Sequence, residues 1–108
     1  MSGTMCVVLS TFANLEDARR VGRALVEERM AACVNVLPGV ESIYRWEGRV
    51  ESGSEVLVLL KTTQGQYPAL EKRLRELHPY EVPEIVALPT HGVLAAYDTW
   101  VGGAVGGV

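Results

Sequence analysis

Residues 32–63, ACVNVLPGVESIYRWEGRVESGSEVLVLLKTT, constrain the fold of this chain more than any other stretch. Polar and apolar residues alternate on both sides of a Pro-Gly pair, and a Glu-Gly pair in the middle has the composition of a turn. The stretch therefore predicts one long β-hairpin. Its second arm contains the apolar run VLVLL at 56–60, which puts apolar side chains on both faces of a strand. One layer of helices can cover only one of these faces, so we expect a second copy of the chain to cover the other.

The length and composition point to one domain that assembles with copies of itself. A chain of 108 residues can bury roughly two thirds of its unfolded surface, which is enough for a core. Counted with glycine and without tyrosine, about 55% of the residues are apolar, more than the roughly 45–50% of an average globular chain. This excess favours an oligomer with a buried interface. We therefore predict a single domain over residues 1–108.

Charge and hydropathy argue against nucleic-acid and membrane partners. The net charge is −3, and acidic and basic residues are interspersed, so there is no basic stripe to bind phosphates. The longest apolar runs have about five residues, whereas a membrane span needs roughly 20. Residues 1–5 lack the features of a signal peptide, and Cys6 and Cys33 are isolated thiols without CxxC spacing. We therefore expect a cytoplasmic protein with reduced cysteines.

The chain on either side of the hairpin predicts three helices and two further strands. Asn14 can cap a first helix through its side-chain oxygen. Thr63 and Gln66 resemble a capping box for a second helix, which should stop at His78 because Pro79 follows. The expected elements are a strand over 5–11, a helix from 13–17 to about 30, a helix from about 64–68 to 78, a strand over 84–88, and a short helix over 93–101 with Leu94, Tyr97 and Trp100 or Val101 facing inward.

This order of elements, strand-helix-strand-strand-helix-strand and then a short helix, is that of a ferredoxin-like fold of the α+β class. Two helices should cover one face of an antiparallel sheet. The other face and the long hairpin between the second and third strands should be offered to partner subunits. The glycine-rich end, about 102–108, has no core-forming pattern and is expected to be a flexible tail.

Several separated motifs resemble the CutA divalent-cation tolerance protein family. They occur in the order expected for that family and cover roughly residues 5 to 101. The resemblance implies a ferredoxin-like subunit, a tight homotrimer like that of the PII signalling proteins, and a cytosolic role in tolerance of divalent metals such as copper. It attaches no secure enzymatic activity. The motifs are Ala32-Cys33-Val34-Asn35, Tyr44-Arg45-Trp46-Glu47-Gly48, Glu55, Leu60-Lys61-Thr62 and His78-Pro79-Tyr80-Glu81-Val82-Pro83-Glu84-Ile85, with Tyr97 and Trp100.

His78 is the first candidate for a metal ligand. Imidazole is the commonest metal ligand in proteins, and the resemblance implies that the His-Pro-Tyr motif carries one of the family's proposed copper ligands. The chain departs from that pattern twice, because Leu77 and Ser10 stand where the better-known bacterial member has a second His and a Cys. Cys33 could supply a thiolate for copper, although its apolar strand predicts that it packs in the core. Three roles stay open for His78: capping a helix end or lining a cleft, ligating a metal weakly, or holding another ligand.

Polar residues among the strands form a second group of candidates. A charged Lys61 after two leucines needs a partner if it is buried, and Glu55 or Glu84 could supply one. The group could form a small-molecule cleft between subunits or an ion pair that fixes the interface, and both remain open. We also expect the two hairpin aromatics to lie near its tip and to pack on a neighbouring subunit. The candidates for a ligand cleft or interface are Asn35, Tyr44, Trp46, Glu55, Lys61, Tyr80, Glu84 and Trp100.

These observations favour a homotrimeric, cytosolic and non-catalytic protein of the CutA type, which requires no cofactor but could bind a divalent metal such as copper weakly. That metal role requires more than one soft ligand near His78. One alternative is a PII-like regulator that binds an anionic metabolite between subunits, which requires several convergent Lys or Arg side chains. The other is a small hydrolase or lyase that uses His78 and Glu84.

Overall fold

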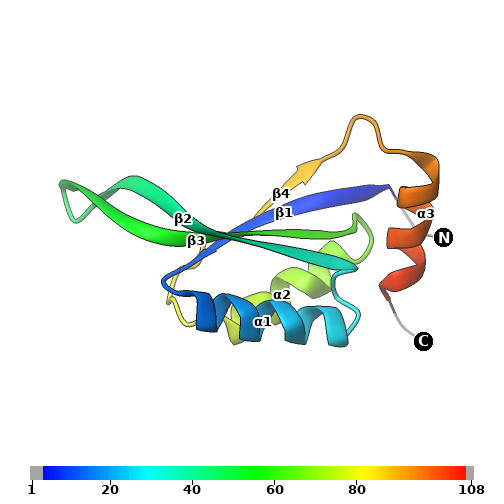
Figure 1. Ribbon diagram of the computed structural model, residues 1–108, viewed down its shortest axis with the longest axis horizontal. Helices are drawn as coiled ribbons and strands as arrows, with labels where there is room; N and C mark the ends of the chain where they lie inside the picture. Colours follow the sequence, from blue (N-terminus) through cyan, green and yellow to red (C-terminus); the bar gives the residue numbers. More distant parts are fainter. Residues whose placement is uncertain (1–3, 107–108) are drawn as a thin grey trace.

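The fold is that of a computed structural model, which describes residues 4–106. One antiparallel sheet of four strands, in the order β2-β3-β1-β4, carries two helices on one face and a third helix at its end (Figure 1). This arrangement confirms the predicted ferredoxin-like α+β fold. The elements are β1 (Met5–Phe12), α1 (Leu15–Glu27), β2 (Cys33–Trp46), β3 (Arg49–Thr63), α2 (Tyr67–Leu77), β4 (Val86–Pro89) and α3 (Ala95–Ala104).

The two longer helices form where the sequence predicted them. Asn14 caps α1, because its Oδ1 accepts a hydrogen bond from the backbone N–H of Asp17 at 2.8 Å. The start of α2 differs from the predicted capping box. The Oγ1 of Thr63 accepts a bond from the N–H of Gln66 at 3.1 Å, but Gln66 is itself the N-terminal cap and makes no side-chain cap bond. Of the helices in residues 4–106, none has the length and apolar character needed to cross a membrane.

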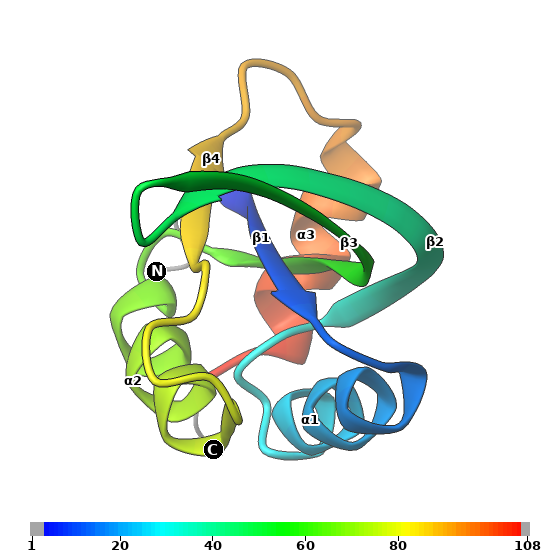
Figure 2. The ribbon, with the colours of Figure 1, turned by 90° about the vertical axis from the view of Figure 1, so that its left-hand side faces the viewer.

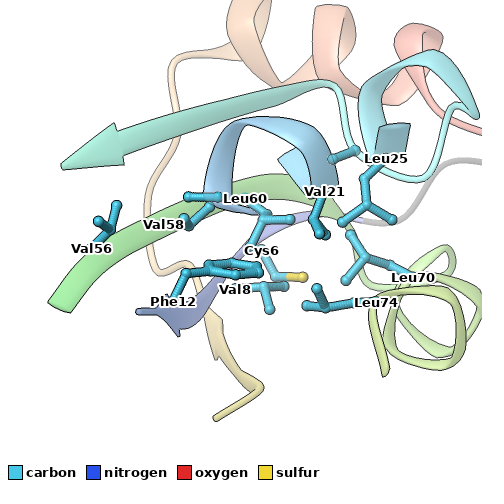
Figure 3. Close-up of a cluster of buried hydrophobic side chains, with 12 residues drawn as sticks. Cys6, Val8, Phe12, Val21, Leu25, Val56, Val58, Leu60, Leu70 and Leu74 are labelled. Carbon is cyan, nitrogen blue, oxygen red and sulfur yellow. The ribbon is translucent and has the colours of Figure 1, made fainter. Parts of the chain in front are cut away.

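The core lies between the sheet and helices α1 and α2 (Figure 3). Alternate residues of β1 and β3 point to this side, which we call the helix-covered face. Figure 2 shows the two helices side by side beneath the sheet, so together they close this face. The enclosed side chains, each at most 5% exposed, are Cys6, Val8 and Phe12 of β1, Val21 and Leu25 of α1, Val56, Val58 and Leu60 of β3, and Leu70 and Leu74 of α2.

The opposite side of the sheet, which we call the open face, carries the other residues of each strand, those that alternate with the core residues. Helix α3 covers its Met5 end, where the fully buried Val101 packs against Met5. Farther along the sheet, Leu37, Val86 and Leu88 remain 39%, 45% and 44% exposed. The apolar run of β3 therefore has apolar side chains on both faces, as predicted, and its own chain closes only one of them. The half-buried apolar residues of the open face are Val7, Leu9, Leu57 and Leu59.

Strands β2 and β3 form one hairpin that extends well beyond the helices (Figure 1). Its last pair is Trp46 opposite Arg49, and Glu47 and Gly48 make the turn, as predicted. Both turn residues have positive φ, 50° and 80°, which suits a two-residue turn that follows the twist of the strands. The molecule reaches 45 Å along its longest axis.

A β-bulge at the Pro-Gly pair of β2 changes which residues of this strand point to the open face. Leu37 lies opposite Leu57 before the bulge and Val40 lies opposite Glu55 after it, so β2 has one more residue than β3 over this interval. Gly39 adopts a φ of 80°, which a residue without Cβ tolerates well. Odd-numbered residues of β2 therefore point to the open face before the bulge, and even-numbered residues do so after it. The even-numbered residues include Ser42, Tyr44 and Trp46.

The third helix begins and ends later than predicted. It starts at Ala95 because the backbone of Leu94 is still extended, with φ −55° and ψ 128°. Leu94, which was expected to face inward, is consequently 77% exposed, and Trp100 is 51% exposed. Val101 is buried, which agrees with the alternative in which Val101 and not Trp100 faces inward.

The C-terminal segment expected to be a tail is helical as far as Ala104. The guanidinium of Arg29 donates to the carbonyl oxygens of Gly103 at 3.0 Å and Gly106 at 2.7 Å, so it holds the end of α3 beside the end of α1. These partners are 74 and 77 residues away from Arg29, and no local pattern predicts such bonds. The remaining residues of the expected tail, 107–108, lie outside the described part of the chain.

The last strand is shorter than predicted. β4 spans Val86–Pro89 instead of 84–88, and it pairs only with Cys6–Leu9 of β1. The end of β1, from Ser10 to Phe12, therefore extends past β4 within the described sheet. The loop between α2 and β4 runs beside this end, and the candidate site forms there.

Candidate functional site

An open groove of about 600 Å³ lies at the base of the projecting hairpin. Side chains from four parts of the chain line it: the end of β1, β2 beyond its bulge, β3, and the loop between α2 and β4. The groove thus brings together five of the residues predicted from the sequence. Its lining is Thr11, Ser42, Ile43, Tyr44, Trp46, Glu55, Tyr80, Val82 and Glu84.

Tyr80 links the loop to the hairpin. Its hydroxyl donates to Oε2 of Glu55 at 2.9 Å. Burial and, to a smaller extent, the hydrogen bond to the Glu55 carboxylate together raise the pKa of Tyr80 to about 12. The phenol therefore stays protonated at neutral pH and keeps one oxygen of Glu55 oriented within the groove.

His78 lies directly behind the groove wall and uses both ring nitrogens. Nε2 lies 2.8 Å from the carbonyl oxygen of Thr11, and the backbone N–H of Tyr80 donates to Nδ1 at 3.1 Å. Because Nδ1 accepts, Nε2 must carry the proton, which fixes the neutral Nε2–H tautomer. The ring also stacks on Phe12 with centroids 4.2 Å apart and an interplanar angle of 17°. His78 is 7% exposed, and burial lowers its pKa.

The position of His78 follows from the short β4. Thr11 lies past the last residue of β1 that pairs with β4, so its carbonyl has no partner strand on that side. The imidazole replaces this partner by donating to the carbonyl, and it fixes the following loop by accepting from Tyr80. Of the roles left open for His78, the geometry therefore favours a structural one at the helix end beside a cleft.

The residues present do not fit the metal that the resemblance implies. Both nitrogens of His78 are engaged by backbone groups, so a metal would have to displace one of these bonds. Cys33 lies on the opposite face of the sheet, because its neighbour Val34 packs into the helix-covered core. Among the residues the structure describes, no group of three or more His, Cys, Asp or Glu side chains could hold a metal ion.

Cys33 itself corrects a prediction, since it was expected to face the core. It pairs across the hairpin with Lys61 on the open face and is half-buried there. Its Sγ lies 3.9 Å from Oδ1 of Asn35. Cys6, in contrast, is buried on the helix-covered face, and burial raises the pKa of its thiol.

Lys61 also has a different partner from the two that were predicted. Its ammonium group donates to Oδ1 of Asn35, whereas Glu55 is bonded to Tyr80. Lys61 and Glu55 lie six residues apart along β3, which is about 20 Å in a strand. Lys61 and Glu55 therefore do not form an ion pair within one subunit, and the polar candidates separate into two groups at opposite ends of the open face.

Trp100 belongs to neither group. It lies on α3, next to Tyr97, with ring centroids 5.6 Å apart. Thr11 and Ser42, in turn, line the groove without having been predicted. The sequence did contain a signal for Ser42. It lies two residues before Tyr44, which lies two residues before Trp46, so the alternation of a strand puts all three on one face. Thr11 carried no such signal, because its contacts depend on where β4 ends.

Comparisons with known proteins agree on one family. Residues 6–104 match the family model described as CutA1 divalent ion tolerance protein. The divalent-cation tolerance protein CutA of Thermus thermophilus is 53% identical over 95 residues, which are 88% of this chain and 92% of that protein. Its solved structure has a TM-score of 0.91 at 50% identity, over 94% of this chain and 99% of the other. The solved CutA of Archaeoglobus fulgidus, described as periplasmic, has a TM-score of 0.90 at 29% identity, with coverages of 94% and 99%.

Proposed function

The chain belongs to the CutA1 divalent ion tolerance family, and we propose that it is a homotrimeric, non-catalytic and cytoplasmic member that acts in the response to divalent metal ions such as copper. The open face of the sheet is the observation that carries this proposal. The folded chain leaves apolar side chains exposed on this face, and an assembly needs such a surface.

The support for the trimer is the apolar surface left over after the chain has folded. Leu37, Val86 and Leu88 are each more than a third exposed on one face, and large exposed apolar patches mark interaction surfaces. The outer strands β2 and β4 also end the described sheet with free edges, which invite pairing with another chain. Copies arranged about a threefold axis would cover both features. We expect each subunit to bury more than the roughly 800 Å² per partner of a standard interface.

Light scattering across a dilution series tests the trimer. We expect a mass three times that of the 11.7 kDa chain throughout the micromolar range. Trp46→Ala should shift dissociation to higher concentration, because large aromatics dominate interface energies. The exposed helical variant Ala69→Ser is the matched control and should assemble like the parent. A folded monomer at micromolar concentration would contradict the proposal.

The non-catalytic role is supported by the state of His78. A general base needs an accessible lone pair, but both nitrogens of this ring bond to backbone groups. Glu84 is exposed on the loop, and the hydrogen bonds of the His78 ring within residues 4–106 go to Thr11 and Tyr80 instead. The alternative of a hydrolase or lyase that uses His78 and Glu84 therefore has no support in the geometry.

The metal role is proposed without a resident ion. Because the described residues offer no set of soft ligands near His78, copper should bind weakly, and the fold and trimer should form without it. Calorimetric titration of copper into the parent and into His78→Gln tests this, with a melt after chelator treatment beside it. Tight stoichiometric binding that is lost in the variant, or an early melt after chelation, would contradict it.

The cytoplasmic location is supported by the two cysteines, which are both free and fit a reducing compartment. Cell fractionation followed by thiol labelling tests this location. We expect the protein in the cytoplasmic fraction with Cys33 reactive after denaturation. Recovery from the periplasm, the compartment described for the Archaeoglobus relative, would overturn it.

A further inference from the structure

We propose that the groove at the base of the hairpin binds an organic cation, an alkylammonium or guanidinium group, between its two carboxylates and three aromatic rings. The proposal goes beyond the metal role of the family, and it holds for the groove of a single subunit. It rests on the charge of the lining, the ring faces and the hydrogen bond that orients Glu55.

The charge of the groove has one sign. Glu55 and Glu84 are its ionisable carboxylates, and no Lys, Arg or His is among the described residues that line it. The hydroxyl groups of Thr11 and Ser42 add further acceptors. An anionic metabolite would meet two like charges here, so this groove lacks the convergent basic side chains that a PII-like regulator would require. A cation meets complementary charge instead.

Three aromatic side chains make the groove selective for a weakly hydrated cation. Tyr44 and Trp46 project from the same face of β2, and Tyr80 faces them from the loop. The faces of such rings attract ammonium and guanidinium groups, most strongly where water is displaced. Tyr44 and Trp46 are 47% and 60% exposed, so their faces are accessible on the isolated chain.

The same geometry disfavours a bare metal ion. Hard divalent cations need about six oxygen ligands at short distance, and Tyr80 already occupies one oxygen of Glu55. The ring faces contribute nothing to such a coordination shell. For an organic cation, the bond from Tyr80 is useful, because it holds the carboxylate in place without neutralising its charge.

The cation could arrive as a free small molecule or on a second copy of the chain. Arg45 and Arg49 lie close to the hairpin tip and are exposed. A neighbouring hairpin could therefore deliver a guanidinium group to the groove. Both sources share the same chemistry, and the experiment separates them.

The experiment uses the full chain with Trp100→Phe, so that Trp46 is the only tryptophan. Methylguanidinium and tetramethylammonium are titrated against Trp46 fluorescence, with methylurea as the neutral control of similar shape. We expect saturable quenching by both cations and none by methylurea. Glu84→Gln should weaken binding about tenfold, and Tyr44→Leu about threefold. Glu81→Gln is the matched control, because it removes the same charge from the same loop but lies outside the groove.

Light scattering of the same samples identifies the source. If the free cations do not bind the assembled protein, but Arg45→Gln or Arg49→Gln weakens assembly as strongly as Glu84→Gln, a neighbouring guanidinium fills the groove. If neither result is obtained, or if methylurea binds equally well, the proposal is overturned. It is also overturned if Glu81→Gln weakens binding as much as Glu84→Gln. If the chain does not form a trimer, light scattering will show it. The cation titration still reports whether the groove binds a cation, so the two proposals can fail separately.

Discussion

The two faces of the sheet are built from similar residues but differ in how completely these residues are buried. Val8, Val58 and Leu60 point to the helix-covered face and are at most 1% exposed. Leu9, Leu57 and Leu59 are their neighbours along the same strands, and they stay half-buried on the open face. The difference shows that alternation in sequence creates two apolar faces, while the helices of one chain can close only one of them. The helix-covered face therefore stabilises the subunit, and the open face is available for assembly and binding.

The largest effect should come from placing a charge on the open face. Leu59→Glu should abolish assembly, because an unpaired charge buried at an interface costs about 3–5 kcal/mol per subunit. The helix-covered face does not contact this residue, so circular dichroism should still report a folded subunit. Light scattering measures the mass. Ala69→Glu, on the outer side of α2, is the control and should remain assembled; a trimeric Leu59→Glu protein would refute the comparison.

A cavity on the helix-covered face should destabilise the subunit itself. Leu74 is fully buried between α2 and the sheet, so Leu74→Ala should lower the free energy of unfolding by about 2–5 kcal/mol. Urea denaturation at a fixed protein concentration measures this loss. Leu88→Ala is the comparison on the open face, where Leu88 is 44% exposed. Under conditions that keep the chain monomeric, it should lower the free energy of unfolding by clearly less than Leu74→Ala. Equal losses would show that the two faces do not differ as described.

His78 connects the two faces, and it should make stability depend on pH. Burial lowers its pKa in the folded state, so the unfolded state, with a pKa of about 6.5, binds a proton more readily. Its contribution is therefore complete above about pH 6.5 and is lost as the pH falls below that value. His78→Gln should unfold about 1–3 kcal/mol more easily at pH 8, because buried backbone groups lose a partner. Melting curves from pH 8 to 5 should show this difference shrinking; a constant difference would argue against the neutral ring.

The smallest effect concerns a polar atom on the helix-covered face. The hydroxyl of Ser10 is fully buried and has no hydrogen-bond partner among the described residues. Ser10→Ala should therefore stabilise the subunit by about 1 kcal/mol, since the cost of burying an unpaired hydroxyl disappears. Thermal unfolding measures the gain, with Ser54→Ala on exposed β3 as the neutral control. A loss of stability in Ser10→Ala would indicate an interaction that the subunit alone does not contain.

Local patterns predicted most of the architecture. The alternation of β2 and β3, the turn at Glu47 and Gly48, and the buried stripes of α1 and α2 follow from periodicity and capping, which involve residues close in sequence. The placement of Tyr44 and Trp46 on one face followed in the same way. These features are correct because no distant contact is needed to produce them.

The contacts that the sequence did not predict join partners that are distant in sequence. Lys61 bonds to Asn35 because the hairpin register brings the two together, and no charge pattern indicated a neutral partner. His78 bonds to Thr11 because β4 ends early. The late end of α3 depends on Arg29. Within the candidate site, residue types could be predicted from the sequence, whereas their pairing needed the register of the whole sheet.

The bulge in β2 absorbs one residue, and this decides which side chains form the wall of the groove. Removing Gly39 would restore strict alternation with Val40 still opposite Glu55, so Tyr44 and Trp46 would keep their side of the sheet. Flattening the bulge with every residue retained would instead make each residue from Val40 to the tip exchange sides, and Ile43 and Arg45 would replace the two aromatic rings. The aromatic wall therefore depends on where the extra residue of β2 is accommodated, and not only on the amino-acid composition of the hairpin.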